Sequence, residues 1–384
     1  MKIISLKLIH KIYKNKKNIN NFPNPHHIKK GFFILELKNK DGVVGYGEMS
    51  SYYCDFKEIV NLIKKKFLKD IINNDITNSL STLDNNIIKH RSKLESTIEA
   101  ALNQSYLDII GKQKGMPVFK FLGKTKNKVK AYASGGLIFS NQEYYTLLDE
   151  VYSAKEKKFF GWKFRPSTPK LFTDHHKRFS QRPKIDVYKL GKFCSFVRKK
   201  IGDTFNLMID LGCRLKPGKE ASYFFDLLND LNFYFVEEPF NRNYFNYKRY
   251  IDINNIACGE DASSIEKLKK FSKFKQIKFL QPDSNLLPFQ NVLKFSKNSN
   301  SKIIVHNWTK SVSFYSNLNL ALINKKCDLI EYNFLNFPKD YEFLKKNYVL
   351  KNGYLNLSSK SGMGIKLIDN SSFKTYKYNF GLNQ

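Results

Sequence analysis

The stretch "YFVEEPF", residues 234–240, joins an apolar segment to two adjacent carboxylates and a proline. The apolar residues predict a buried strand, which ends at Glu237 and Glu238 because Pro239 cannot continue the hydrogen bonding of a central strand. A single acidic strand end is common where a strand runs out into solvent. The stretch therefore becomes informative only if other strands end in the same way.

Four other apolar runs also end in a residue that can bind a metal ion or carry a proton. Together with "YFVEEPF" they give five successive positions: Asp210, Glu237, Glu260, Asp283 and His306. The intervals are 27, 23, 23 and 23 residues, each long enough for one strand and one helix. In a closed barrel of such units the carboxyl ends of all strands face one mouth. We therefore expect these five side chains around one cavity.

The chain after residue 129 repeats this alternation of a short apolar run and an amphipathic helical pattern, which predicts an α/β barrel over residues 129–350. Residues 1–128 instead begin with strands joined by a turn at Asp41-Gly42 and continue with helices, which predicts an α+β domain. We expect residues 351–384 to pack back on this first domain. The strand candidates of the barrel are "KVKAYASG", "FFGWKFRP", "FNLMIDLG", "FYFVEEPF", "IACGED", "IKFLQPD", "KIIVHN" and "DLIEYN".

Three carboxylates at consecutive strand ends indicate a metal site. Asp210, Glu237 and Glu260 would repel one another at one mouth unless a cation neutralises them. Hard oxygen ligands of this type suit a divalent ion such as Mg²⁺. The sequence therefore predicts a site for a divalent cation at the mouth of the barrel.

Composition argues against several other classes of protein. The formal charge of +32 over 384 residues comes from lysines scattered among Asn, Ile and Phe, without a nucleic-acid-binding motif, so it indicates a generally basic surface. The five cysteines form no CxxC pair, which favours a reducing compartment over a disulfide or zinc framework. The apolar runs are too short for a signal peptide or a membrane span. We expect a cytoplasmic protein without a nucleic-acid or membrane partner.

The ordered motifs resemble those of the enolase superfamily, mandelate racemase subgroup, which is mandelate racemase/muconate lactonizing enzyme-like and of the acid-sugar dehydratase type. The resemblance extends from "DGVVGYGE" to "SGMGIK", and rests mainly on "GWKFR", "MIDLG", "VEEP", "CGED", "QPD", "VHNW" and "LIEY". It implies an N-terminal capping domain over a modified (β/α)7β barrel. It also implies one essential Mg²⁺, removal of the proton α to a substrate carboxylate, and assembly as a dimer or octamer.

The resemblance assigns roles by position in the motifs. It implies Asp210, Glu237 and Glu260 as the metal ligands. Glu237 is preferred to Glu238 because the family's ligand stands two residues before the proline. Glu331 in "LIEY" matches the family glutamate that hydrogen-bonds the substrate carboxylate when it is protonated.

The expected chemistry requires a base as well as a cation. Removing a proton α to a carboxylate creates a second negative charge, and a cation is needed where that charge develops to stabilise the enediolate. We expect His306 to be the base, with Asp283 orienting its ring and raising its basicity.

The second strand departs from the family pattern. It reads Lys163-Phe164-Arg165 where the family usually has Lys-x-Lys, whose second lysine is the opposing base. Arginine is a poor proton acceptor. A racemase needs bases on both faces of its substrate, whereas a dehydratase can work with His306 alone. The sequence therefore favours dehydration of an acid sugar, an aldonate or aldarate, to a 2-keto-3-deoxy acid.

Two alternatives stay open from the sequence. A racemase or epimerase of a 2-substituted acid would use the same enediolate chemistry, with Lys163 as the second base. A basic scaffold or nucleic-acid-binding protein on a disused barrel is the alternative from another class, and the preserved metal ligands argue against it. Two pairs of loop histidines are further candidates for contact with an anionic, small-molecule substrate: His26 and His27, and His175 and His176 in the long segment 167–186.

Overall fold

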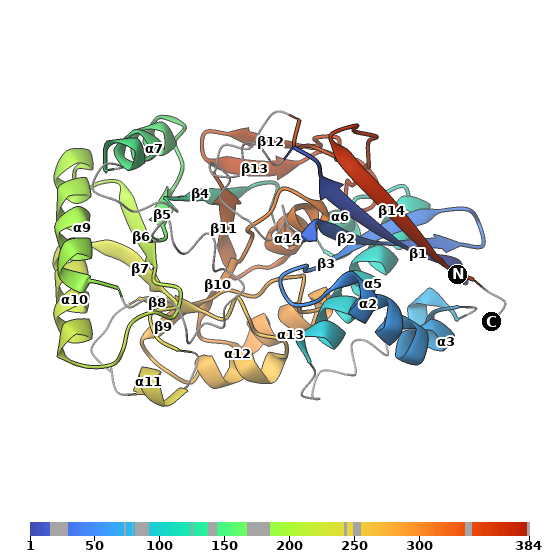
Figure 1. Ribbon diagram of the computed structural model, residues 1–384, viewed down its shortest axis with the longest axis horizontal. Coiled ribbons are helices and arrows are strands. Elements are labelled where there is room, and N and C mark those ends of the chain that lie inside the picture. Colours follow the sequence, from blue (N-terminus) through green and yellow to red (C-terminus); the bar gives the residue numbers. More distant parts are fainter. Residues whose placement is uncertain are drawn as a thin grey trace.

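The computed structural model describes residues 1–15, 30–72, 74–78, 80, 92–123, 126–136, 144–166, 185–241, 244–248, 255–334 and 340–381. These residues form a barrel and a smaller antiparallel sheet that lie side by side (Figure 1). His26, His27, His175 and His176 lie outside the described residues.

The barrel is a closed parallel sheet. Its last strand pairs with its first, with Leu329 opposite Lys130 and Asn333 opposite Ser134, so the sheet has no open parallel edge. Each of the eight apolar runs singled out in the sequence contributes one strand, which confirms the predicted α/β barrel. In order around the barrel the strands are β4 (Val129–Gly135), β5 (Gly161–Phe164), β6 (Asn206–Asp210), β7 (Phe233–Glu237), β8 (Ile256–Cys258), β9 (Ile277–Leu280), β10 (Lys302–Val305) and β11 (Cys327–Asn333).

Helices fill the connections between consecutive barrel strands, which gives the (β/α)7β order. Helix α9, for example, buries Leu190, Phe193 and Val197 against the barrel and exposes polar residues, whereas α14 is buried along its whole length. Figure 1 shows α9 and α10 along one edge of the barrel and α12 and α13 along another. In chain order the helices are α7 (Tyr144–Glu156), α9 (Val187–Ile201), α10 (Lys219–Asp230), α11 (Tyr244–Lys248), α12 (Ile265–Phe271), α13 (Phe289–Asn298) and α14 (Val312–Ile323).

The interior of the barrel is packed with side chains below the mouth. Seven of the barrel strands each supply one buried residue to this layer, where Phe235 and Phe279 lie with ring centroids 5.6 Å apart. Packed layers of this kind leave only the mouth for a ligand. The residues of the layer are Tyr132, Met208, Phe235, Ala257, Phe279, Ile304 and Leu329.

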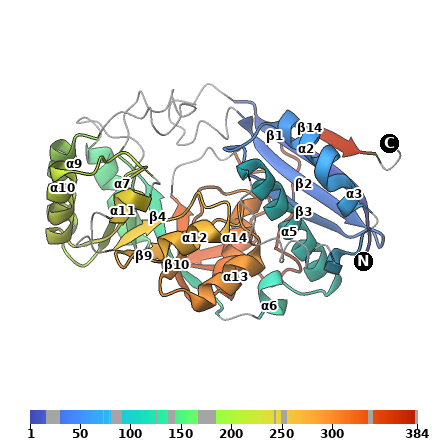
Figure 2. The ribbon, with the colours of Figure 1, turned by 90° about the horizontal axis from the view of Figure 1, so that it is seen from below.

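The first domain is a four-stranded antiparallel sheet covered by helices. Its strands follow the order β14 (Phe373–Phe380), β1 (Ile3–Tyr13), β2 (Phe32–Asn39) and β3 (Val44–Met49). The long helix α5 (Lys93–Gln113) packs so closely on β3 that a Cβ atom on Gly47 would meet the carbonyl oxygen of Ala101 at 2.0 Å. Figure 2 shows α5 between this sheet and the barrel. The other helical segments are α2 (Phe56–Leu62), η2 (Ile63–Phe67), α3 (Leu68–Ile71) and α6 (Val118–Phe121).

The end of the chain serves both parts of the structure. Strand β14 pairs with β1, as expected for a tail that returns to the first domain. The hairpin of β12 (Tyr348–Lys351) and β13 (Tyr354–Leu357), however, crosses the boundary predicted after residue 350, and β13 pairs with β4 of the barrel. Asn352 and Gly353 form its turn with positive φ angles of 50° and 72°. An Asn-Gly pair is a strong hairpin signal.

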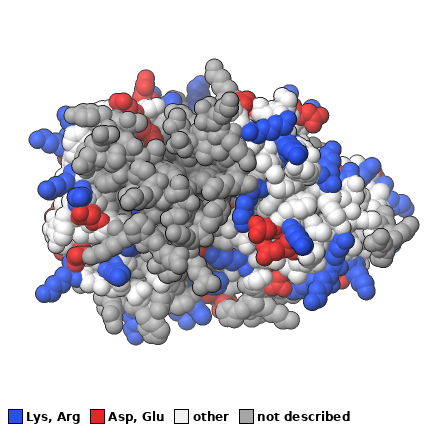
Figure 3. Space-filling model, viewed as in Figure 1, with Lys and Arg blue, Asp and Glu red and all other residues white. Residues whose placement is uncertain are grey.

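The described part of the surface in Figure 3 carries more Lys and Arg than Asp and Glu side chains. Lys and Arg side chains occur around the described outline of the molecule and alternate with Asp and Glu. No helix in the described ranges is both long and apolar enough to cross a membrane.

The first domain contacts the barrel at the carboxyl ends of its strands. Gln104 of α5 donates from Nε2 to the carbonyl oxygen of Ser284, just after β9. Glu48, in β3, accepts a 2.8 Å hydrogen bond from the backbone N–H of Ser313 in the first turn of α14. A carboxylate at a helix N-terminus stabilises the helix. The first domain thus holds the loops that form the mouth.

Burial raises the pKa of Glu48 to about 7, against hydrogen bonds from Ser311 and Ser313 that lower it. Between pH 4.5, the ordinary pKa of this group, and about pH 7, Glu48 holds a proton in the folded protein that it has lost in the unfolded chain. This contribution to stability is therefore present at low pH and falls as the pH rises through this window, by up to about 1.4 kcal/mol per pH unit.

We predict that Glu48→Gln removes this part of the pH dependence, because glutamine does not ionise. The free energy of unfolding of wild type and variant, compared by denaturant titration from pH 4.5 to 8, measures the difference. Glu156→Gln, at an exposed position of α7, is the control and should leave the pH dependence unchanged. Parallel pH profiles for wild type and Glu48→Gln would contradict the prediction.

Candidate active site

The structure brings all eight predicted site residues together at the mouth of the barrel. They form one continuous network of ion pairs, in which each residue contacts at least one other. Strand order explains the convergence, since Asp210 and Glu237 lie directly opposite each other in neighbouring parallel strands. The eight residues are Lys163, Arg165, Asp210, Glu237, Glu260, Asp283, His306 and Glu331.

Lys163 lies between two buried carboxylates. Its Nζ donates to both carboxylate oxygens of Glu237 at 2.7 Å, and forms an ion pair with Glu331 Oε1, also at 2.7 Å. Burial lowers the pKa of Lys163, but the charges of Glu237 and Glu331 outweigh it and hold the pKa well above its ordinary value. In this arrangement Lys163 is a fixed cation, which disfavours the alternative that it acts as a base.

Arg165 occupies the position of the expected opposing base and contacts acids. Its Nε lies 2.6 Å from Asp210 Oδ2, and its Nη2 lies 4.0 Å from Glu260 Oε1. Burial raises the pKa of Asp210, but Arg165 and Lys163 outweigh it and hold the pKa below the ordinary value. The guanidinium thus provides a second permanent positive charge at the mouth.

His306 and Asp283 form the expected pair. Nδ1 of the ring lies 2.8 Å from Asp283 Oδ2, so the other ring nitrogen, Nε2, faces the mouth. Burial lowers the pKa of His306, but the hydrogen bond to Asp283 and the charges of Glu331 and Glu260 raise it to about 10. Nε2 lies 3.3 Å from Glu260 Oε2, so a role as base requires these negative charges to be matched by other cations.

The role that the resemblance implies for Glu331 requires a protonated carboxyl group. Burial raises the pKa of its carboxyl group, but Lys163 and His306 outweigh it and hold the pKa below the ordinary value. The group is therefore ionised in this arrangement, whereas the expected hydrogen bond to a substrate carboxylate needs a protonated acid. Here Glu331 instead orients Lys163 and accepts a 3.0 Å hydrogen bond from the backbone N–H of Asn307.

The two adjacent carboxylates of "YFVEEPF" have different roles. Glu237 points into the mouth, whereas Glu238 accepts a 2.9 Å hydrogen bond from the backbone N–H of Gly259, just before Glu260. Glu238 has a positive φ of 40°, which turns the chain at the end of β7. It therefore helps to hold the loop that carries the third carboxylate of the predicted metal site.

Several residues at the mouth were not identified from the sequence. Gln281 donates from Nε2 to Glu237 Oε2, and it stands two residues before Asp283 in the "QPD" motif, which could have indicated it. Tyr53 of the first domain donates from its hydroxyl to Asp261, beside Glu260. Tyr53 lies in the loop before α2, and nothing in the spacing of the sequence predicts that this loop reaches the barrel.

The carboxylate oxygens at the mouth are ligands of the type that binds a divalent cation. The predicted residues supply five carboxylates against three cationic groups when His306 is protonated, which leaves an excess of two negative charges. Burial raises the pKa of Glu237, Lys163 lowers it, and the charges of Asp210, Glu331 and Glu260 raise it again, with a net value of about 8, so negative charge is in excess there. In the side-chain conformations described, these oxygens face Lys163 and Arg165, and no three acidic, His or Cys side chains of the described residues converge as metal ligands do.

Two family models match this chain. The family model described as "Enolase C-terminal domain-like" matches residues 153–371, and the "Mandelate racemase / muconate lactonizing enzyme, N-terminal domain" matches residues 22–123. The chain belongs to the mandelate racemase/muconate lactonizing enzyme family of the enolase superfamily. This confirms the resemblance found in the sequence; the first segment covers the barrel from within α7 onward, and the second covers most of the first domain.

Relatives within this family are distant in sequence and similar in length. D-gluconate/D-galactonate dehydratase of Picrophilus torridus is 25% identical over 356 residues, covering 86% of this chain and 85% of the relative. Arabinonate dehydratase of Saccharolobus solfataricus is 22% identical over 354 residues, covering 89% of each chain. Among solved structures, the 3,6-anhydro-D-galactonate cycloisomerase of Zobellia galactanivorans has a TM-score of 0.75 and 19% identity, covering 96% of this chain and 97% of that one. The structural likeness establishes the enolase-type fold.

We predict that Lys163→Met destabilises the protein by about 3–5 kcal/mol when divalent cations are removed with EDTA, because Glu237 and Glu331 then lose the cation that they share in the interior. Denaturant titration measures the change. Lys302→Met, at the exposed start of β10, is the matched control and should change stability by no more than about 0.5 kcal/mol. Equal stabilities for the two variants would show that Lys163 is not the counter-ion of these carboxylates.

Proposed function

We propose that this protein is a Mg²⁺-dependent dehydratase of an acid sugar, an aldonate or aldarate, that forms a 2-keto-3-deoxy acid. The observation that carries the proposal is the asymmetry of the mouth. On one side the His306 ring is oriented by Asp283 and would transfer the proton, whereas Lys163 and Arg165 on the other side are a lysine and an arginine paired with carboxylates and would act as fixed cations. One base suffices for dehydration, whereas inversion of a stereocentre needs two.

His306 would carry out both proton transfers. Nε2 removes the proton on the carbon next to the substrate carboxylate, while Asp283 orients the ring through Nδ1. The same proton then passes to the hydroxyl on the next carbon, whose C–O bond breaks as the carbon–carbon double bond forms. Water leaves, and the resulting enol becomes the 2-keto-3-deoxy acid.

The permanent cations of the chain would bind the anionic end of the substrate. Arg165 is the more accessible of the two, with 21% of its side chain exposed against 4% for Lys163. A guanidinium can make two parallel hydrogen bonds to a carboxylate. We propose that Arg165 exchanges part of its contact with Asp210 for the substrate carboxylate.

Asp210, Glu237 and Glu260 would hold the Mg²⁺ ion. When bound, the ion supplies positive charge beside the substrate carboxylate, where negative charge develops. The excess of negative charge at the mouth and the raised pKa of Glu237 support this assignment.

The names of the relatives support the reaction class. Both curated relatives described above are named as dehydratases of acid sugars, and each matches more than four-fifths of this chain. Their identities of 25% and 22% are too low to transfer a particular sugar. The proposal therefore specifies the class of substrate and leaves its chain length and stereochemistry to experiment.

We predict that the purified protein with Mg²⁺ converts at least one member of a panel of aldonates and aldarates in D₂O, with proton NMR showing both loss of the α-proton and a 2-keto-3-deoxy product. His306→Asn should lower kcat by about 10²–10⁴-fold, since it removes the general base. His10→Asn is the control: His10 is bound to the carbonyl oxygen of Lys30 in the first domain and should not affect kcat.

Two outcomes would contradict the proposal. Full activity of His306→Asn would exclude the assigned base. Deuterium entering the α-position without loss of water would identify a racemase or epimerase, and Lys163→Ala should then abolish exchange from one face only.

A further inference from the structure

We infer that Asn317 of helix α14 is a positioning residue that fixes the Asp283 carboxylate and, through it, the ring of His306. The inference rests on the proposed function for its effect on the reaction, while the geometric part concerns Asn317, Asp283 and His306 alone. Asn317 lies 34 residues after Asp283 and has no role in the motifs described above.

The oxygen and the nitrogen of the Asn317 side-chain amide both contact one short loop. Its Oδ1 accepts a 2.9 Å hydrogen bond from the backbone N–H of Ser284, and its Nδ2 donates to Asp283 Oδ1 at 3.1 Å. Because a backbone N–H can only donate, the first contact fixes which end of the amide is the oxygen. The NH₂ group must then face Asp283.

These contacts determine which carboxylate oxygen is left for the histidine. Asp283 Oδ1 accepts from Asn317 and also from the backbone N–H of Asn285 at 2.8 Å. Oδ2 remains for His306 Nδ1, also at 2.8 Å. Two donors on one oxygen hold the plane of the carboxylate and prevent it from turning away from the ring. Without Asn317, one backbone donor would hold Oδ1, and the plane could rotate about it.

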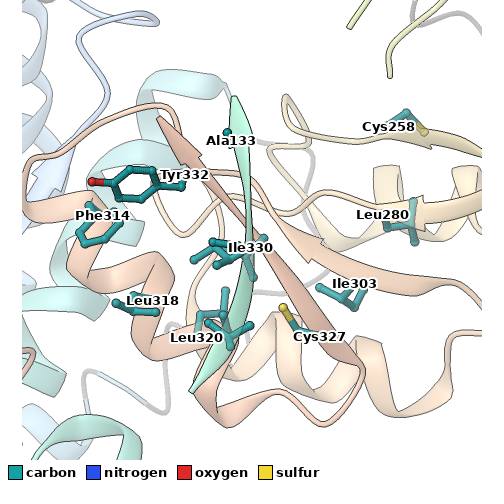
Figure 4. Close-up of a cluster of buried hydrophobic side chains, with 14 of the residues drawn as sticks. Ala133, Cys258, Leu280, Ile303, Phe314, Leu318, Leu320, Cys327, Ile330 and Tyr332 are labelled. Carbon is teal, nitrogen blue, oxygen red and sulfur yellow. The ribbon is translucent and has the colours of Figure 1, made fainter. Parts of the chain in front are cut away.

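Helix α14 is rigid enough to serve as the support. Asn317 is 1% exposed, and the nearby apolar residues Tyr315 and Leu318 of the same helix are buried. Figure 4 shows Phe314 and Leu318 of α14 pointing toward Tyr332 and Ile330 of β11. This packing fixes the helix against the wall of the barrel, so Asn317 presents its amide to the loop after β9 from a fixed position.

The start of the helix is fixed from the other domain. Glu48 accepts from the N–H of Ser313, one turn before Asn317. The carboxylate of Glu48 therefore connects the first domain to the element that orients Asp283. Among the hydrogen bonds of the described residues, Asn317 is the one side chain that joins α14 to the His306–Asp283 pair. Removal of Asn317 therefore interrupts this connection.

The test is the imidazole N–H signal of His306 in Mg²⁺-loaded protein labelled with ¹⁵N-histidine. A ring N–H donated to a carboxylate is protected from exchange and resonates far downfield; His306→Asn and Asp283→Asn assign the signal by its loss. Asn317→Ala and Asn317→Asp should broaden or remove it. Asn317→Asp keeps an acceptor for Ser284 but has no donor for Asp283. Asn317→Ala removes both hydrogen bonds without adding charge. The two variants would therefore disturb the fold in different ways, and an effect common to both comes from the lost bond to Asp283.

Asn319→Ala is the matched control. Asn319 is the same residue type on the same helix and is equally buried, but it donates to the carbonyl oxygens of Tyr315 and Met363. It should leave the His306 signal unchanged. In steady-state kinetics the Asn317 variants should lower kcat by about 10- to 100-fold with KM unchanged, as expected when a reacting group is misplaced.

The outcomes separate the inference from the proposed function. Loss of the signal in both Asn317 variants, with the signal kept in Asn319→Ala, supports the positioning role even if the wild type dehydrates no acid sugar. An unchanged signal in both Asn317 variants overturns it, whatever their kcat. Equal loss of the signal in Asn319→Ala also overturns it, because the effect would then come from helix stability alone.

Discussion

The pairing of β11 with β4 is the constraint on which the site depends. It closes the parallel sheet and places the carboxyl ends of all barrel strands around one mouth. Residues that are 23 to 27 positions apart in the sequence thereby become neighbours. Without closure, Glu331 of the last strand could not share Lys163 of the second strand with Glu237.

Closure of the barrel also brings charged side chains together at the mouth, and their balance determines which of them are held as ions. Carboxylates outnumber cations at the mouth, and burial makes each unpaired negative charge costly. Lys163 and Arg165 offset part of this cost and are thereby fixed as cations rather than bases. Under the proposed function, the arginine at position 165 would have two consequences: it would provide a permanent positive charge near the substrate, and it would leave His306 as the proton-transfer group.

The sequence predicted the barrel and the convergence of five strand-end residues because both follow from periodicity, whereas Lys163, Arg165 and Glu331 were singled out by the resemblance to a family. Asp210 and Glu237 could be found from the spacing of strand ends, which is set by backbone geometry. The ionisation state of Glu331 could not, because it depends on two side chains from other strands. Asn317 was missed because α14 is buried on all sides, so its polar residues break no amphipathic pattern. The pairing of β13 with β4 of the barrel depends on contacts between segments far apart in the sequence, which periodicity does not predict.

The most direct test of the account is a crystal structure of the protein grown with Mn²⁺ in place of Mg²⁺, with the ion located by its anomalous scattering. The account predicts one ion bound by carboxylate oxygens of Asp210, Glu237 and Glu260, with Arg165 displaced from Asp210. If the mouth binds no ion and Arg165 and Lys163 keep their contacts with Asp210 and Glu237, the proposed metal-dependent removal of an α-proton would be contradicted.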